Sequence, residues 1–396
     1  MKIIFVTPRF PYPMIGGDRT QSFNLLKNLA KNHEVHLVSN AENGPLSGEQ
    51  KNKVSSLGIF VHEVHFNKWR AVLRSVSLIF SQKPLEVTFY NSPKIRKVVQ
   101  NLFNEIKPDV VISFSIRTAE SAVKLSCKKI LLANDCRLLY QSRSAKESNS
   151  SIQKIVRLFE IQKLKKYEPE IFSKFDLVTF VTKIDLENAQ LNAPKMNGEV
   201  LTCGVDLDEF KPNKKPREKV MLFAGKLDVF ANTMMAQKVA QKIFPLVAKK
   251  IDELSCEIVG GCPPKSILNL ASKKIKIIKD VPSLVPYFQN AGVFVHPLAG
   301  SSGIQNKLLE AMACGCPIIT TPLGTQGIPI KHGVGAYIAK NDEEMVSYSV
   351  ELLNNKEKAI AMGEAARKLM EQNFSWKIIS EKMEEILSKT VFPNKV

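Results

Sequence analysis

The sequence predicts an α/β protein built from two doubly wound, parallel-sheet domains. Short apolar segments alternate with helical patterns through both halves of the chain, which is typical of parallel sheets. The 396 residues, 44% of them hydrophobic, suffice for two domains with full cores. The charged, Pro-containing run KPNKKPREK at 211–219 is typical of an interdomain hinge. We therefore expect domains at 1–212 and 213–375, with a terminal helix in 376–396.

The formal net charge of +18 predicts an anionic partner. Nucleic acid, an anionic membrane surface and phosphorylated small molecules all carry the required charge. No nucleic-acid module is recognisable, and the lysines are spread over the chain, so we expect no nucleic-acid partner. The same charge is also compatible with solvated helix faces alone.

Cysteine usage and apolar run lengths indicate a reduced compartment. The seven cysteines are an odd number without a C-x-x-C pair, so neither disulfides nor a zinc site is predicted. The longest apolar runs are far below the roughly 18 residues of a membrane span, and the run at 3–6 is too short for a signal peptide. We expect a cytoplasmic protein, at most peripheral on the inner face of the membrane.

The first unit of the chain predicts a loop that faces a ligand. KIIFVT at 2–7 is a buried strand, the Pro/Gly-rich residues 8–18 form a loop, and 19–31 has helical spacing. Gly16 and Gly17 allow the backbone to approach a ligand closely, and Arg19 is the cation expected there. Further on, the strand KILLAND ends at Asp135, a second candidate at the carboxyl end of a parallel strand.

The segment 301–321, SSGIQNKLLEAMACGCPIITT, carries the clearest ligand pattern. Ser302 and Gln305 match a capping box, which predicts a helix that begins after Ser302 and offers free amides to a phosphate. Lys307 supplies a point charge for a diphosphate, and Glu310 can accept two ribose hydroxyls. The alternative is an ordinary helix–strand unit with a solvated Glu.

Residues 65–83 predict an amphipathic helix. Trp69, Val72, Leu73, Val76, Ile79 and Phe80 fall on one face, whereas Lys68, Arg70 and Arg74 are basic. This pattern is typical of a helix that lies on an anionic membrane. A helix packed on its own domain would show the same pattern.

Three segments together resemble glycosyltransferase family 4. These are the Gly16-Gly17 loop with its helix, LTCGVDLDEFKP at 201–212, and LEAMACG at 309–315. The resemblance covers nearly the whole chain. It implies the GT-B architecture, in which two Rossmann-like domains face each other across a cleft and the C-terminal helix crosses back to the first domain.

The resemblance also implies a donor site in the second half. The family grips the donor diphosphate with two cations that follow the first strand of this domain, and Lys226 takes the first position. Asn232 stands where the second cation is expected, so Lys307 is the candidate replacement. No metal ion is expected, since the family uses side chains and amides for the diphosphate.

One position departs from the family's E-x7-E pattern. Glu310 is the second Glu, but the first falls on Ser302, which resembles a branch of the family that lacks it. Ser302, Gly303 and Ile304 are assigned to phosphate and Glu310 to ribose. Asp135, Lys226 and Glu310 are the predicted catalytic residues.

The predicted activity is therefore the transfer of a sugar, with retention, from a UDP- or GDP-linked donor to a saccharide or lipid-linked acceptor in cell-envelope or polysaccharide biosynthesis. No cofactor beyond the nucleotide sugar is expected. Two alternatives remain at this point: an inactive partner subunit of the same fold, and a sugar-nucleotide epimerase.

Overall fold

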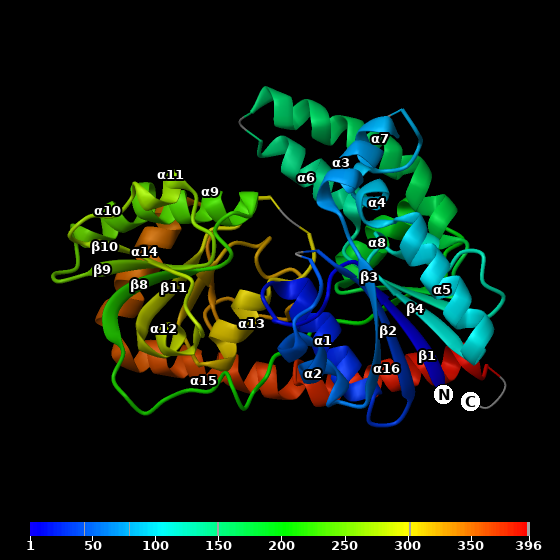
Figure 1. The fold of residues 1–396 in the computed structure, drawn as a ribbon. Coiled ribbons are helices and arrows are strands. Elements are labelled where there is room, and N and C mark those ends of the chain that lie inside the picture. Colours follow the sequence, from blue (N-terminus) through cyan, green and yellow to red (C-terminus); the bar gives the residue numbers. More distant parts are fainter. Residues whose placement is uncertain (43, 79, 149, 301, 394–396) are drawn as a thin grey trace. The chain divides into compact units, whose positions relative to one another are not determined.

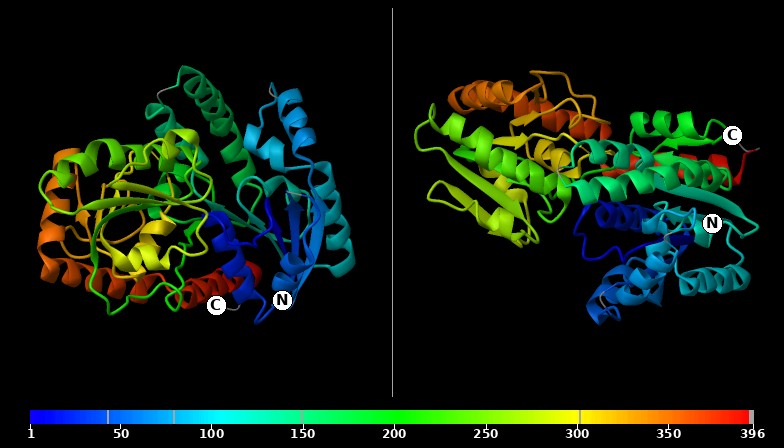
Figure 2. Two further views of the ribbon diagram at one scale, coloured as in Figure 1. Left: turned by 60° about the vertical axis from the view of Figure 1, so that its left-hand side comes forward. Right: turned by 90° about the horizontal axis from the view of Figure 1, so that it is seen from above.

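The structure, a computed structural model, describes residues 1–42, 44–78, 80–148, 150–300 and 302–393. It divides into two compact units (Figure 1). Unit 1 comprises residues 1–202 and the chain from Ile379 onward, and unit 2 comprises Cys203–Ile378. Both units contain one parallel sheet with helices on its faces (Figure 2), which confirms the predicted α/β class with two parallel-sheet domains.

Unit 1 contains a seven-stranded sheet in the order β3-β2-β1-β4-β5-β6-β7, and every strand pairs in parallel with its neighbours. Its strands are β1 Lys2–Thr7, β2 Glu34–Ala41, β3 Ile59–His65, β4 Val110–Phe114, β5 Lys128–Asn134, β6 Leu177–Phe180 and β7 Gly198–Val200. Its helices are α1 Gly17–Leu29, α2 Gly48–Ser55, α3 Lys68–Ser77, α4 Leu85–Tyr90, α5 Pro93–Ile106, α6 Arg137–Lys146, α7 Ser151–Phe172, α8 Lys183–Asn192 and α16 Trp376–Val391, of which α16 begins in unit 2.

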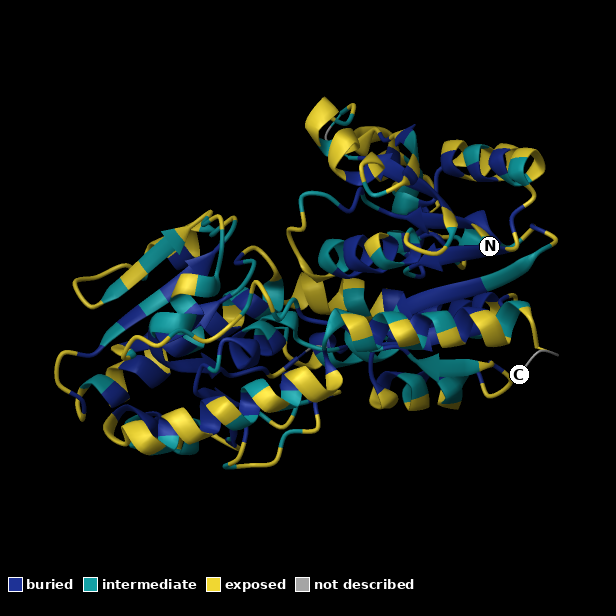
Figure 3. Ribbon diagram, turned by 90° about the horizontal axis from the view of Figure 1, so that it is seen from below, coloured by how far each residue is buried: buried dark blue, intermediate teal, exposed yellow. Residues whose placement is uncertain are grey.

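The core of unit 1 is built on strands that are buried on both faces of the sheet. Central strands are apolar on both sides, as expected of a sheet covered on both faces, and Figure 3 shows these strands as buried. One cluster joins strand residues such as Val6 and Val111 to buried residues of α5 and α7, including Val99 and Ile171. The sheet is therefore held by burial of apolar side chains against its helices.

The connection between β4 and β5 is unusually short for a parallel crossover. It contains only the 3₁₀ turn η1, Ala119–Ser121, where a full α-helix would be usual. Ala119 and Ala122 pack into the same core cluster as α5 and α7. The helical layer is thus thin between α5 and α7.

The long helix α7 passes through Pro169 without a break, although the sequence allowed an interruption there. A proline cannot donate to the carbonyl four residues earlier, so the Lys165 carbonyl loses its helical partner. Asn192 Nδ2 donates to that carbonyl at 3.3 Å. The side chain of a neighbouring helix therefore replaces the missing bond.

Unit 2 contains a six-stranded sheet in the order β10-β9-β8-β11-β12-β13, also parallel throughout. Its strands are β8 Glu218–Ala224, β9 Ser255–Gly260, β10 Ile275–Lys279, β11 Ala291–His296, β12 Ile318–Thr320 and β13 Tyr337–Ile338. Its helices are α9 Phe230–Lys238, the π-helix η2 Val239–Ile243, α10 Phe244–Ala248, α11 Lys265–Leu268, α12 Val285–Asn290, α13 Asn306–Ala313, α14 Asp342–Asn354 and α15 Lys356–Asn373. This unit has its own core cluster, which includes Phe223, Ile258 and Val295.

The segment before the expected hinge at Pro212 belongs to unit 2 from Cys203 onward. Val205 N donates to Phe374 O at 2.7 Å. Arg367 Nη1 donates to the carbonyls of Leu207 and Phe210 at 3.2 and 2.7 Å. These bonds fix the segment to the end of α15. At its other end, unit 2 extends to Ile378, inside α16.

Candidate functional site

The predicted donor residues of unit 2 gather at the carboxyl ends of β8 and β11. Lys226 follows β8 and its turn at Gly225, and Lys307 lies in the first turn of α13. A Cβ added at Gly225 would lie 3.3 Å from Lys307 Nζ. The ammonium of Lys307 therefore sits directly over the end of β8, in the region where open parallel sheets bind ligands.

Asn232 joins the two lysines. This side chain, on the first turn of α9, donates from Nδ2 to the Lys226 carbonyl at 2.8 Å. Its Oδ1 accepts a hydrogen bond from Lys307 Nζ. Asn232 occupies the position at which the family pattern has its second cation. The Lys307 ammonium lies against this Asn232 side chain.

The electrostatics of Lys307 differ from those of Lys226. Burial lowers the pKa of Lys307 to about 7, although Glu310 opposes the shift. Lys226 is half-exposed and pairs with Asp228 at 3.0 Å. The site thus contains one paired surface cation and one desolvated amine whose partner is a neutral amide.

Glu310 lies one turn after Lys307 on α13. Burial raises the pKa of its carboxyl to about 7, with a further contribution from Glu209, while Lys307 acts in the opposite direction. The neighbours Leu308, Leu309 and Met312 are buried in the core and hold the helix in place. A carboxyl and an ammonium are therefore presented together beside the end of β8.

The predicted capping box at Ser302 is wrong. Helix α13 begins at Asn306 with Gln305 at its N-cap, and Gln305 makes no side-chain cap bond. The reason is Gly303, whose φ of 72° lies in the left-handed region and cannot continue a right-handed helix. Ser302, Gly303 and Ile304 therefore form a turn ahead of the helix, with Ser302 largely buried, and do not form its first turn.

Sequence reasoning missed His296, the last residue of β11. Its side chain is fully buried, and its Nδ1 lies 3.0 Å from Thr320 Oγ1. Burial and the charge of Lys307 hold the pKa of His296 well below its usual value. Nε2 is buried without a hydrogen-bond partner among the described residues. Its only sequence signal was its position at a strand end.

In unit 1, the helix that follows the glycine loop begins at Gly17, two residues before the predicted start at Arg19. Gly16 is the N-cap of α1 with a φ of 97°, and Gly17 is the first helical residue. Arg19 lies in the first turn, and its Nη2 is 3.4 Å from Glu42 Oε2. Its guanidinium is thus paired with a carboxylate that follows β2.

Asp135 belongs to a network of charges at the carboxyl end of β5. Its carboxylate accepts from Arg137 Nη1 at 2.9 Å, and Arg137 Nε donates to Glu86 at 2.7 Å. Arg117 Nε reaches the other oxygen of Glu86 at 3.0 Å. Burial opposes ionisation of Glu86, but the two arginines outweigh it and lower its pKa to about 2. No local sequence pattern predicted this network, because its members come from three separate segments.

Two absences bear on the site, within the residues that the structure describes. No group of three or more His, Cys, Asp or Glu side chains is arranged to hold a metal ion. None of the helices in this part of the chain has the length and apolar character needed to cross a membrane.

Comparison with known proteins gives a family match within unit 2. A family model described as "Glycosyl transferases group 1" matches residues 218–355. An uncharacterized 44.6 kDa protein in the cps region of Klebsiella pneumoniae is 24% identical over 381 residues, which cover 90% of this chain and 93% of that protein. A GDP-mannose-dependent alpha-(1-6)-phosphatidylinositol monomannoside mannosyltransferase of Mycolicibacterium smegmatis is 26% identical over 237 residues, which cover 54% of this chain and 62% of that relative.

Among solved structures, Anabaena Alr3699/HepE in complex with UDP and glucose superposes with a TM-score of 0.69 at 14% identity, covering 98% of this chain and 100% of that one. At this identity the likeness concerns the fold. The matched domain holds Lys226, Asn232, Lys307 and Glu310. With the GT-B fold and a group 1 glycosyltransferase domain in unit 2, the chain is a glycosyltransferase, similar to those of family 4.

Proposed function

We propose that the protein transfers a sugar, with retention of configuration, from a nucleotide diphosphate sugar to a saccharide or lipid-linked acceptor of the cell envelope or capsule. The observation that carries the proposal is the pair Lys307 and Glu310 on α13, beside the carboxyl end of β8. Two relatives support a role in the cell envelope or capsule. One is a protein of a cps region, and the other is a phosphatidylinositol monomannoside mannosyltransferase. The Anabaena neighbour, whose complex contains UDP, supports a UDP-linked donor, and the mannosyltransferase supports a GDP-linked one.

In the proposed donor site, Lys307 and Lys226 contact the diphosphate, with the turn at Ser302, Gly303 and Ile304 beside it. Glu310 accepts the ribose hydroxyls. The sugar–phosphate bond breaks while a bond to the acceptor oxygen forms. Negative charge grows on the departing diphosphate, which takes up the proton that the acceptor hydroxyl releases. Because the Lys307 ammonium has an amide as its hydrogen-bond partner, its charge is available to the diphosphate when that charge develops.

The acceptor is proposed to bind on unit 1, at the carboxyl ends of its strands. Gly16, Gly17 and Arg19 line one part of this edge, and Asp135 lies at the end of β5. Arg19 and Asp135 are both in ion pairs. A surface of paired charges suits a neutral hydroxyl acceptor, because it offers hydrogen bonds without a strong net field.

The test of the donor site is calorimetric binding of UDP, GDP, ADP and their common sugar conjugates to the wild type and to Glu310→Ala. Loss of hydrogen bonds to a charged group should weaken binding of one nucleotide class by about tenfold to a hundredfold. Glu364→Ala is the matched control, since Glu364 is an exposed carboxylate of α15 in the same unit. Equal affinities for wild type and Glu310→Ala would refute the site. For the nucleotide that binds, nuclear magnetic resonance of the transfer product tests retention at the anomeric carbon.

Contact with an anionic membrane through 65–83 is part of the proposal. In α3 only Ala71 is buried, whereas the side chains of Trp69, Leu73 and Val76 are 80%, 68% and 60% exposed. This exposure leaves an apolar face of α3 available to a lipid surface, although the helix also contacts α4. Ile79 lies outside the described residues.

Arg74 does not fit the expected basic face. Its guanidinium donates to the carbonyls of Thr88 and Phe89 at 2.7 and 2.5 Å, so Arg74 fastens α3 to α4. Co-sedimentation with phosphatidylglycerol vesicles tests the contact, and Leu73→Ser combined with Val76→Ser should reduce the bound fraction. Unchanged sedimentation would refute the role of α3.

A further inference from the structure

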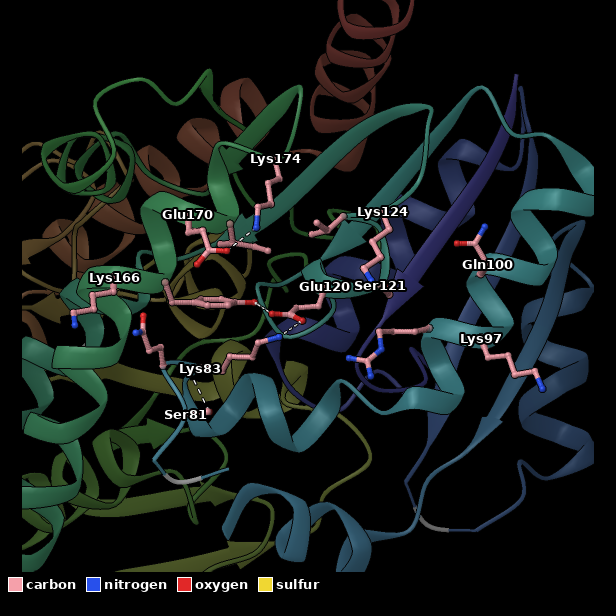
Figure 4. A pocket seen from close by; sticks show the side chains of 15 residues that line it. Ser81, Lys83, Lys97, Gln100, Glu120, Ser121, Lys124, Lys166, Glu170 and Lys174 are labelled. Atoms are coloured by element: carbon pink, nitrogen blue, oxygen red, sulfur yellow. Dashed lines mark hydrogen bonds and ion pairs between the residues drawn. The ribbon is translucent and has the colours of Figure 1, made fainter. Parts of the chain in front are cut away.

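A pocket of about 720 Å³ opens in the helical layer of unit 1 (Figure 4). Residues of α5 line one side and residues of α7 the opposite side, with Glu120 and Ser121 between them. The pocket lies where the β4–β5 crossover provides η1 in place of a helix. It is therefore a consequence of the topology of the unit.

The lining of this pocket is strongly basic. Six cations, from four separate segments of unit 1, surround it together with two carboxylates. The cations are Lys83, Arg96, Lys97, Lys124, Lys166 and Lys174, and the carboxylates are Glu120 and Glu170. The hydroxyl of Ser81 adds a neutral polar group, whereas the Ser121 hydroxyl donates to the Thr118 carbonyl at 2.6 Å. Such a lining has a net positive charge even with both carboxylates ionised.

Both carboxylates are already occupied by other lining residues. Glu120 pairs with Lys83 at 2.5 Å and also accepts from Tyr167 Oη at 3.3 Å. Glu170 pairs with Lys174 at 2.6 Å. The remaining four cations form no ion pair with the residues that the structure describes: Arg96, Lys97, Lys124 and Lys166.

We propose that this pocket binds a phosphate-bearing ligand with more than one negative charge. Its volume lies within the range of small-molecule sites, about 300–1,000 Å³. Lysine acts as a point charge toward phosphate, and each phosphate monoester contributes close to two negative charges. Two phosphate groups would balance the four unpaired cations. The site is separate from the donor residues, all of which lie in unit 2.

Two sources can supply this chemistry. One is a soluble compound such as a sugar phosphate or diphosphate. The other is the headgroup of an anionic phospholipid. Its acyl chains would then meet Phe80, which follows α3, precedes the lining residue Ser81 and is 95% exposed.

The experiment measures binding of inorganic pyrophosphate by calorimetry, and of phosphatidylglycerol vesicles by co-sedimentation, to the full chain carrying Lys307→Met, which weakens pyrophosphate binding at the proposed donor site. The pocket variant combines Lys124→Gln with Lys166→Gln. The control combines Lys94→Gln with Lys165→Gln, which removes the same charge from exposed positions of α5 and α7 outside the lining. All four lysines are exposed, so both variants should fold, and their melting profiles verify this.

We expect pyrophosphate affinity to fall by about tenfold or more in the pocket variant and by less than about twofold in the control. Pocket-dependent binding of pyrophosphate with equal vesicle binding by both variants indicates a soluble ligand. A loss of vesicle binding confined to the pocket variant indicates a lipid headgroup. Equal losses in both variants, or no binding of either probe, overturn the proposal. Nucleotide binding at Lys307 is measured separately, so failure here does not bear on the donor site.

Discussion

The carboxyl ends of the strands in the two units hold their charges in opposite ways. In unit 1, Arg19 is paired with Glu42, and Arg117 and Arg137 share Glu86. In unit 2, the Lys307 ammonium binds the neutral amide of Asn232, and burial lowers its pKa. Paired charges make a rigid and nearly neutral surface, whereas a desolvated cation favours an incoming anion. The comparison supports a diphosphate at unit 2 and an uncharged hydroxyl at unit 1.

The largest expected effect is on the charge network of unit 1. Arg137→Met leaves the Glu86 carboxylate with one arginine in a largely buried place, and should cost about 3–5 kcal/mol of unfolding free energy. Because Glu86 has a lowered pKa in the folded protein, its contribution is present above pH 4.5 and is lost as the pH falls toward 2. Urea unfolding of wild type and variant across that range measures both effects.

A control for this variant breaks an exposed pair of the same unit. Lys183→Met removes the ion-pair partner of Glu187 on the surface of α8. In the wild type, Lys183 Nζ lies 3.6 Å from Glu187 Oε1. The cost should stay below about 1 kcal/mol. A similar loss in both variants would mean that the unit 1 network is no stronger than a surface pair.

The next effect is on ligand binding in unit 2. Lys307→Met should weaken nucleotide diphosphate binding by about tenfold to a hundredfold, because a charge-assisted bond to phosphate is lost. Arg19→Met, at the paired site of unit 1, should leave this affinity within about twofold. Calorimetry of both variants with the same nucleotide makes the measurement. Comparable losses in the two variants would abolish the distinction between the units.

The smallest effect comes from a variant that gives unit 2 the character of unit 1. Asn232→Asp places a carboxylate against Lys307, which should raise the pKa of the lysine. Because the carboxylate also competes with the diphosphate for this cation, nucleotide affinity should fall by several-fold, at most about tenfold. Since the wild-type pKa is about 7, diphosphate binding at pH 8 should take up a proton. Calorimetry in buffers of different ionisation enthalpy measures that uptake, which should shrink in the variant.

Asn232→Ala separates charge from geometry in this test. It removes the same hydrogen bonds without adding a carboxylate, so it should keep the proton uptake. If the alanine and aspartate variants behave alike, the amide acts through its hydrogen bonds alone.

The parallel sheets and most of their helices could be predicted from the sequence. Short apolar strands and the helically spaced segments between them are both local signals. Lys307 and Glu310 could be proposed as site residues for the same reason, since both lie on one short helix. The helix start was predicted at Ser302 because a capping box is a local pattern, while the left-handed conformation of Gly303 is seen only in the structure. The partner of Lys307 comes from Asn232, 75 residues earlier, and such a distant pair leaves no local signal.

The separate cores of the two units have a consequence for how the molecule melts. The two clusters of buried residues share no member, so we expect each unit to have its own cooperative transition, in which case a single melting temperature would not describe the chain. A bound nucleotide should raise only the transition of unit 2, by mass action. The two tryptophans, Trp69 in unit 1 and Trp376 in unit 2, provide one fluorescent reporter for each transition.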